Sequence, residues 1–194
     1  MPVGKVIYLT GAPASGKSST TRLLRDVVPE LQVWEYGARL TEYVRRRSDA
    51  VLDQNDLRSQ SAQAVTAEDV QRLDDELLEF VARERTRANV IIDSHAVTKE
   101  AWGFRVVPFS LARFAQLAPD EIWMLFTGPA TAVSRIEEDP GGRPVVSEEE
   151  ARMHTHLQAS VAATYAMSLG VPLYLFDSSG PQGELVRLLA DRLS

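Results

Sequence analysis

The sequence contains no cysteine, and this absence excludes several kinds of site. A chain of 194 residues without cysteine has no disulfide, no zinc site built from thiolates and no cysteine nucleophile. Histidine is also scarce, with only His95, His154 and His156. The last two lie two positions apart on an expected helix, so their side chains diverge by about 200°. We therefore expect no metal site built from histidines.

The chain also has little positive charge. Its 21 lysines and arginines are outnumbered by 27 aspartates and glutamates, which gives a net charge of -6. Proteins that bind nucleic acids use a basic face to contact the phosphates, so we expect no nucleic-acid partner. A small phosphorylated ligand remains compatible with this charge, because a local site can be positive on an acidic protein.

Long hydrophobic runs are missing as well. No apolar run approaches the roughly 20 residues that a membrane-spanning helix requires, and the first residues lack the layout of a signal peptide. We therefore expect a cytoplasmic protein with no membrane partner. Its 44% hydrophobic and 25% charged residues are typical of a globular protein, and the length favours one domain over residues 1–194.

Short apolar runs alternate with helical patterns along the chain. The expected strands are residues 6–9, 31–36, 90–92, 122–126 and 172–176. Helices are expected over residues 17–28, 38–47, 110–117, 130–138 and 183–193, and from two capping-box signatures at Thr66 with Asp69 and at Ser147 with Glu150. A loop is expected around Gly103. This alternation predicts an α/β fold with a parallel sheet covered on both faces, and such folds bind ligands at the carboxyl ends of their strands.

The motif with the clearest chemistry follows the first expected strand. Residues 11–18, GAPASGKS, fit the phosphate-binding pattern G-x-x-x-x-G-K-[ST] at every fixed position. In this pattern, backbone N–H groups and a helix N-terminus surround phosphate oxygens, the lysine reaches the β- and γ-phosphates, and the serine hydroxyl reaches Mg²⁺. The motif thus predicts a site for the phosphates of a nucleotide and for Mg²⁺. The expected nucleotide-binding residues are Gly11, Ala12, Pro13, Ala14, Ser15, Gly16, Lys17, Ser18 and Ser19.

Asp93 is the second predicted functional residue. It ends the apolar run 90–92, so its carboxylate should lie at the sheet edge near the phosphates. A carboxylate there can hold Mg²⁺ together with Ser18, or accept a proton from a nucleophile. A structural cap for the following loop is the alternative interpretation of Asp93.

Several segments together resemble the archaeal-type adenylate kinases, within the P-loop nucleoside-monophosphate kinases. In chain order these segments are Thr10–Ser18, Tyr36-Gly37, Asp56–Arg58, Ile92–Val97, Gly103-Phe104 with Pro108, Ala118–Asp120 and Ser134-Arg135. The resemblance implies a P-loop kinase three-layer sandwich with a five-stranded parallel sheet, helices on both faces and a short lid. It also implies ATP and Mg²⁺ as cofactors, an acceptor-binding region at about 37–66 and a lid at about 136–146.

The resemblance, together with arginines and a histidine of this chain that would lie near the acceptor, predicts further site residues. Arg135 and Arg143 would act with Lys17 and Asp93 in catalysis. The expected residues of the acceptor site are Gly37, Arg39, Arg58, His95, Gly103, Phe104 and Arg105. This chain departs from the family in having arginine at 39 and 105, an acidic lid with Glu138, and Gln158-Ala159 where the family tends to have another arginine.

The leading hypothesis is therefore an ATP-dependent phosphotransferase that acts on a small acceptor. The acceptor that the resemblance favours is a nucleoside monophosphate, and in particular AMP. Two alternatives stay open: a kinase for another small acceptor, such as a nucleoside or another hydroxyl compound, and a nucleotide-binding switch or slow ATPase that acts through a partner protein. The sequence leaves the oligomeric state open.

Overall fold

A five-stranded parallel sheet forms the centre of the molecule. The computed structural model describes residues 4–47, 65–100, 102–139 and 145–194. The strands follow the order β2-β3-β1-β6-β7 across the sheet, which confirms the predicted fold class. Their bounds are β1 Val6–Thr10, β2 Gln32–Glu35, β3 Val90–Asp93, β6 Glu121–Phe126 and β7 Leu173–Asp177. Because β1 is central, the loop that follows it opens at the middle of the carboxyl edge.

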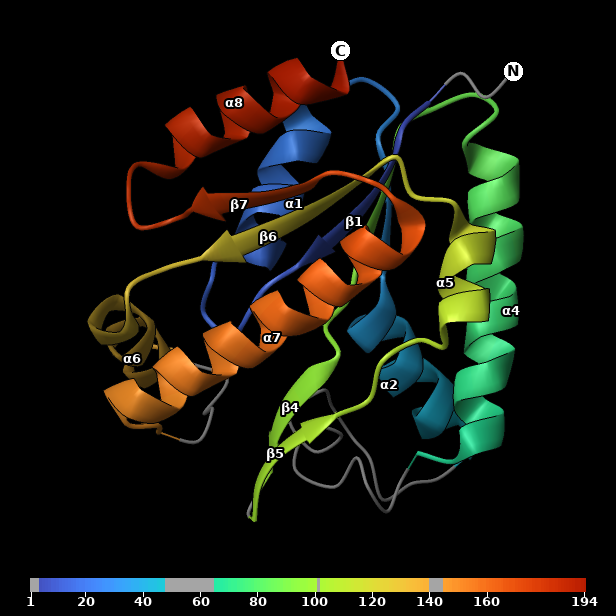
Figure 1. Ribbon diagram of the computed structural model, residues 1–194. Coiled ribbons are helices and arrows are strands. Elements are labelled where there is room, and N and C mark those ends of the chain that lie inside the picture. Colours follow the sequence, from blue (N-terminus) through green and yellow to red (C-terminus); the bar gives the residue numbers. More distant parts are fainter. Residues whose placement is uncertain (1–3, 48–64, 101, 140–144) are drawn as a thin grey trace.

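Helices cover both faces of this sheet (Figure 1). The helices α1 and α8 pack on one face, and α4, α5 and α7 pack on the other. The described helices are α1 Lys17–Val27, α2 Tyr36–Arg47, α4 Ala67–Glu84, α5 Leu111–Leu117, α6 Pro129–Glu137, α7 Glu148–Leu169 and α8 Gln182–Leu193. None of the helices in the described ranges is long and apolar enough to cross a membrane.

Successive side chains of each strand point to opposite faces of the sheet, so the core has two layers. In β1, Val6 and Tyr8 face α4, α5 and α7, whereas Ile7 and Leu9 face α1 and α8. All four side chains are almost fully buried. A strand that is buried on both faces is continuously apolar, which is why the short runs in the sequence predicted these strands well.

Side-chain caps set the starts of the long helices. Thr66 accepts a hydrogen bond from the Asp69 amide, and the Asp69 carboxylate accepts one from the Thr66 amide. The same reciprocal pair joins Ser147 and Glu150 at the start of α7. Both predicted capping boxes are therefore confirmed.

A hairpin replaces the loop expected around Gly103. The strands β4 Val97–Glu100 and β5 Gly103–Val106 are antiparallel and form a separate two-stranded sheet. Val97 is fully buried where β4 packs against α7. The hairpin lies at the lower end of the view in Figure 1, away from both chain termini.

Candidate active site

The segment Gly11–Ser18 joins the end of β1 to the start of α1. A Cβ atom on Gly11 would lie 2.4 Å from the carbonyl oxygen of Leu125 in β6 and 2.6 Å from Ser15 Oγ, so only glycine fits there. Gly16 is the N-cap of α1 and has a φ of 80°, a conformation that glycine adopts without strain. Glycine is therefore required at position 11 for steric reasons and favoured at position 16 by the backbone conformation.

The electrostatics of this loop suit a phosphate. No side chain caps α1, and its first turn has no acidic residue, so its N-terminal amides and dipole remain available to an anion. Ser15 Oγ is buried and makes no hydrogen bond among the described residues. Lys17 Nζ lies inside the loop and donates to the Gly11 carbonyl at 2.9 Å. The loop therefore combines a cation, exposed backbone dipoles and a polar atom without a partner in the structure.

Asp93 lies at the carboxyl edge of the sheet, as expected from the sequence. It is in register with Leu9 of β1 and with Glu35 of β2, which places its side chain on the α1 face. Burial raises the pKa of the Asp93 carboxyl, Glu35 raises it further, and the Lys17 ammonium opposes both effects. Asp93 and Lys17 are thus electrostatically coupled at the mouth of the loop.

Two oxygen-bearing side chains at this edge suit Mg²⁺. Ser18 is exposed in the first turn of α1, and Asp93 is the last residue of β3. Among the described residues, no group of three or more histidines, cysteines or acidic residues is placed to hold a metal. Mg²⁺ is commonly bound by one or two protein oxygens together with substrate phosphates, so this donor set fits a cation that arrives with a nucleotide.

Arg135 connects α6 to the phosphate-binding loop. Its Nη1 donates to the Ala14 carbonyl at 3.2 Å, and its Nη2 donates to the Ser178 carbonyl at 2.9 Å. The predicted catalytic arginine thus lies directly against the loop. Through Ser178 it also contacts the segment after β7, whose residues were not among the predicted site residues.

The ends of β6 and β7 form this additional wall. Thr127 and Ser179 share a hydrogen bond of 2.9 Å between their hydroxyl groups, and Ser178 donates to the Phe126 carbonyl at 2.9 Å. A signal was present in the sequence: residues 178–181, SSGP, form a turn-like cluster directly after an expected strand. In a parallel sheet, such a cluster lies at the ligand-binding edge.

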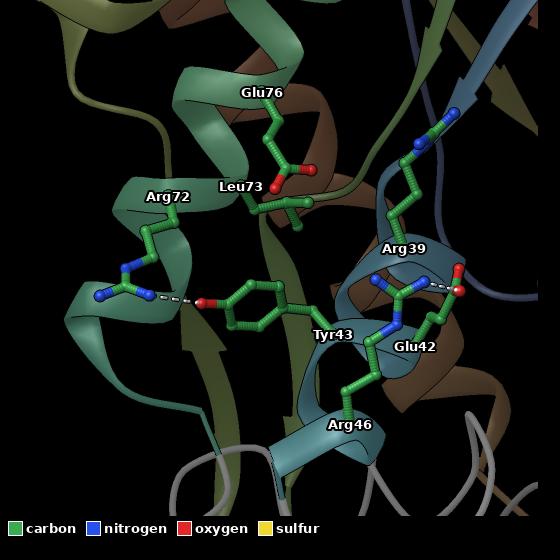
Figure 2. Close-up of a pocket in the computed structure, with 7 residues that line it drawn as sticks. All are labelled: Arg39, Glu42, Tyr43, Arg46, Arg72, Leu73 and Glu76. Atoms are coloured by element: carbon green, nitrogen blue, oxygen red, sulfur yellow. Dashed lines mark hydrogen bonds and ion pairs between the residues drawn. The ribbon is translucent and has the colours of Figure 1, made fainter.

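Arg39, predicted to contact the acceptor, packs against aromatic rings instead of projecting freely. Its guanidinium carbon lies 3.8 Å from the centre of the Trp34 ring and 5.7 Å from that of Phe80. Figure 2 shows it turned away from the Tyr43 side of a cavity between α2 and α4. This cavity has a volume of about 420 Å³ and is lined by Arg39, Glu42, Tyr43, Arg46, Arg72, Leu73 and Glu76.

The β4–β5 hairpin carries the predicted residues Gly103, Phe104 and Arg105. Arg105 forms an ion pair with Glu100 across the hairpin, with Nε 3.1 Å from the carboxylate. The Phe104 ring packs edge-on against His154 of α7, with ring centres 5.3 Å apart. The Trp102 side chain, which precedes them, is 73% exposed. The hairpin residues are therefore held by α7 and by each other.

The remaining predicted residues divide into described and undescribed positions. Gly37 lies in the first turn of α2, and the half-buried His95 lies between β3 and β4. Arg58 and Arg143 lie outside the described residues, as do positions 48–64 of the expected acceptor region and 140–144 of the expected lid. The structure thus brings Lys17, Ser18, Asp93 and Arg135 to one edge.

The helix α7 contributes two buried polar residues that were not predicted as functional. Gln158 Nε2 donates to Thr10 Oγ1 at 2.8 Å, and Gln158 Oε1 accepts from the Val97 amide at 3.2 Å. His154 Nε2 lies 3.0 Å from the Val97 carbonyl oxygen. Burial lowers the pKa of His154 to about 4. Their pairing depends on how α7 packs, which the sequence pattern does not reveal.

Comparison with known proteins supports the interpretation of this edge as a nucleotide site. Residues 10–152 match the family described as AAA domain. An adenylate kinase from Pyrobaculum aerophilum is 26% identical, over 76% of this chain and 72% of that protein. An adenylate kinase from Pyrococcus furiosus is 24% identical, over 95% of this chain and 94% of that protein.

Solved structures show the same fold at low sequence identity. A tunicamycin resistance protein from Deinococcus radiodurans superposes with a TM-score of 0.57 at 15% identity, over 98% of this chain and 96% of that chain. A gluconokinase from Sinorhizobium meliloti 1021 superposes with a TM-score of 0.51 at 16% identity, over 100% of this chain and 97% of that chain. Both structures match nearly the full length of the chain.

Proposed function

The chain belongs to the AAA domain family and is a P-loop small-molecule kinase, and we propose that it transfers the γ-phosphoryl group of Mg-ATP to a nucleoside monophosphate, AMP. The observation that carries this proposal is the convergence of Lys17, Ser18, Asp93 and Arg135 on the loop after β1. The similarity to two adenylate kinases supports AMP as the acceptor.

Each residue has a role that follows from its position. Lys17 and Arg135 place positive charge beside the phosphate loop, where charge on the migrating phosphoryl group is neutralised. The Ser18 hydroxyl and the Asp93 carboxylate would hold Mg²⁺, which supplies further charge neutralisation when it is bound. An AMP phosphate oxygen forms the new P–O bond, and ADP leaves with the electrons of the broken bond. Arg143 and a lid at about 136–146 complete this proposal on the basis of the resemblance.

The acceptor would lie between the start of α2, with Gly37 and Arg39, and the β4–β5 hairpin, with Gly103, Phe104 and Arg105. His95 and Arg58 complete the proposed set. AMP brings its own ionised phosphate, so the reaction requires no general base. Asp93 is then free to hold the cation.

The reverse reaction gives the most selective test. The protein is supplied with Mg²⁺ and ADP alone, and the ATP that forms is measured with luciferase. An adenylate kinase converts two ADP into ATP and AMP, whereas a hydroxyl kinase or an ATPase makes no ATP from ADP. We expect ATP to accumulate, and its absence at high enzyme concentration would exclude the AMP proposal.

Lys17→Met provides the matching loss-of-function variant. Removing one charge that stabilises the transition state costs about 100- to 1000-fold in kcat, so ATP formation should fall by that amount. The control is Lys5→Met, because Lys5 lies at the opposite edge of the sheet and donates to the Arg192 carbonyl. Equal rates for wild type and Lys17→Met would show that the activity comes from a contaminant.

A second acceptor class is favoured by one observation. Two of the three arginines expected at the acceptor site lie in the described ranges, and they already have partners: Arg39 packs against Trp34, and Arg105 pairs with Glu100. An acceptor without a phosphate would leave these contacts intact, and its hydroxyl would require Asp93 as the base. The two acceptor classes are distinguished by measuring ADP release from ATP with AMP and with a panel of nucleosides and other hydroxyl compounds. Turnover of a hydroxyl compound far above that of AMP would replace the first proposal.

A further inference from the structure

One face of α7 contacts the β4–β5 hairpin at three levels. Glu150, His154 and Gln158 are spaced four residues apart, so they lie along one side of the helix. Glu150 pairs with Lys99 of β4 at 3.2 Å. His154 and Gln158 both reach the backbone of Val97 at the start of the same strand. The position of the hairpin is therefore determined by α7.

Gln158 differs from the other two because it also reaches the phosphate-binding loop. Its side chain is fully buried, and both ends of its amide are used. The NH₂ group donates to Thr10, the last residue of β1, directly before Gly11. The carbonyl oxygen accepts from Val97. One rigid amide thus joins the root of the phosphate loop to the root of the hairpin.

The neighbouring contact fixes the second backbone group of Val97. The Val97 carbonyl accepts from His154 Nε2, a donation that the neutral imidazole makes. The Phe104 ring then closes over His154 from the other strand of the hairpin. The amide and the carbonyl of one β4 residue are therefore both held by α7, so the hairpin cannot shift along the helix without breaking buried hydrogen bonds.

We propose that Gln158 is a positioning residue that holds the β4–β5 hairpin at a fixed distance from the phosphate-binding loop, so that nucleotide binding at the loop restrains the hairpin. The link runs from Gly11 through Thr10 and Gln158 to Val97. It rests on the proposed function only for the statement that the hairpin contacts the acceptor. The mechanical connection itself is independent of which acceptor is used.

The first experiment measures the connection without any acceptor. Amide hydrogen exchange of the hairpin is followed by mass spectrometry, with and without the ATP analogue AMP-PNP and Mg²⁺. In the wild type, we expect the analogue to slow exchange in peptides that contain residues 97–100 and 103–106. In Gln158→Met, which keeps the length and volume of the side chain but removes both hydrogen bonds, this slowing should be lost. An identical response in both proteins would overturn the proposal.

The second experiment separates positioning from simple destabilisation. Thr10→Val removes the contact to the loop and leaves that to Val97, so it should also abolish the response of the hairpin. Ser160→Ala is the matched control on α7, because among the described residues the exposed Ser160 hydroxyl donates only to the His156 carbonyl of the same helix. It should respond as the wild type does. Retention of the wild-type response in Thr10→Val would show that the link does not pass through Thr10.

The third experiment measures kcat and the KM values for AMP and ATP in wild type and Gln158→Met. Misplacement of a reacting group by about 1 Å costs roughly 100-fold in rate, so Gln158→Met should lower kcat and raise the KM for AMP by a combined 10- to 100-fold. The KM for ATP should stay within about twofold, because the contacts of the loop itself are retained. Equal rises in the KM for AMP and the KM for ATP would indicate that the substitution disturbs the whole site, and would contradict the proposal. If wild type turns over no AMP, the proposed acceptor fails, while the exchange experiment still decides the role of Gln158.

Discussion

At the level of single residues, Arg135 shows how the geometry of a guanidinium determines a role. Its two terminal nitrogens, Nη1 and Nη2, donate to the carbonyls of Ala14 and Ser178, which belong to segments far apart in the chain. A lysine offers one ammonium and cannot reproduce this fork. We expect Arg135→Lys to weaken AMP-PNP binding by roughly 10- to 100-fold, since a hydrogen bond from a charged donor contributes about 1.5–3 kcal/mol. Calorimetric titration measures this change.

The control for that variant is Arg187→Lys. Arg187 is exposed on α8, and within the described part of the chain its Nε donates only to the Gly183 carbonyl of the same helix. The Arg187→Lys variant should bind AMP-PNP with the same affinity as the wild type. If Arg135→Lys also bound as the wild type does, Arg135 would contribute to the loop only through its charge.

His154 gives a prediction for stability against pH. Its pKa falls from 6.5 to about 4 in the folded protein because the ring is buried. The unfolded chain therefore binds more protons between these two values, and stability is lost as the pH falls through that window. At about pH 4.5 the loss amounts to about 2–3 kcal/mol relative to neutral pH. Urea unfolding of wild type and His154→Gln at both pH values measures this loss.

The difference in the loss of stability between wild type and His154→Gln gives the contribution of His154 alone. Asp74 and Asp93 have raised pKa values because of burial, so they act in the opposite sense and stabilise the fold as the pH falls. Both proteins contain them, and their contribution cancels in the comparison. An equal loss of stability in wild type and His154→Gln would mean that His154 is not held neutral.

The location of a single residue could be predicted from the sequence where the backbone decides it. Lys17 and Asp93 are placed by the motif and by the end of a strand, so their location followed from the sequence. Arg39 and Arg105 were expected to face a ligand, but their actual neighbours, Trp34 and Glu100, depend on packing. A long flexible side chain takes whichever partner the fold brings near, and a one-dimensional pattern does not contain that information.

At the level of elements, α7 depends on its capping box. Ser147 accepts from the Glu150 amide, and its own amide donates to the Glu150 carboxylate. Replacing a serine cap by alanine costs about 1 kcal/mol, so we expect Ser147→Ala to lower the free energy of unfolding by that amount. Chemical denaturation measures it. Ser160→Ala, at an exposed position within the same helix, is the control and should change stability by less than about 0.5 kcal/mol.

The elements that were predicted well share strong local signals. Apolar strands, helix stripes and both capping boxes were confirmed because each depends on neighbouring residues. The β4–β5 hairpin was missed because β4, with Thr98, Lys99 and Glu100, is mostly polar, and the intervening residues 101–102 (Ala-Trp) lack the glycine or asparagine that favours tight turns. Its formation depends on α7, which buries Val97 and supplies the contacts that hold the strand.

At the level of the whole molecule, a set of stabilising hydrogen bonds lies at the amino edge of the sheet, opposite the candidate active site. Asn89 joins three elements at the amino edge: its carbonyl oxygen Oδ1 accepts from the Lys5 amide at 2.8 Å, and its Nδ2 donates to the Leu193 carbonyl at 2.7 Å. Asn89→Ala leaves both backbone groups without these partners, which costs about 1–3 kcal/mol. We expect a lower unfolding midpoint with unchanged AMP-PNP affinity.

The matched control for Asn89 is Thr86→Ala. Thr86 is exposed, and the one partner of its hydroxyl among the residues that the structure describes is the Arg83 carbonyl in the same turn, so its loss should leave the midpoint nearly unchanged. Weakened nucleotide binding in folded Asn89→Ala would contradict the separation of the two edges. It would show that the amino edge also shapes the phosphate-binding loop.

The close contact of Gly11 with β6 bears on the entropy of nucleotide binding. Because the loop starts in direct contact with the Leu125 carbonyl, its first residue is already ordered by the sheet. Fixing a backbone residue costs about 1–2 kcal/mol, and here that cost belongs to folding and is not subtracted from affinity. Under the proposed function, the nucleotide phosphates would meet a loop whose first residue needs no further ordering, so that the free energy of the phosphate contacts would remain available for holding the γ-phosphoryl group in line with its acceptor.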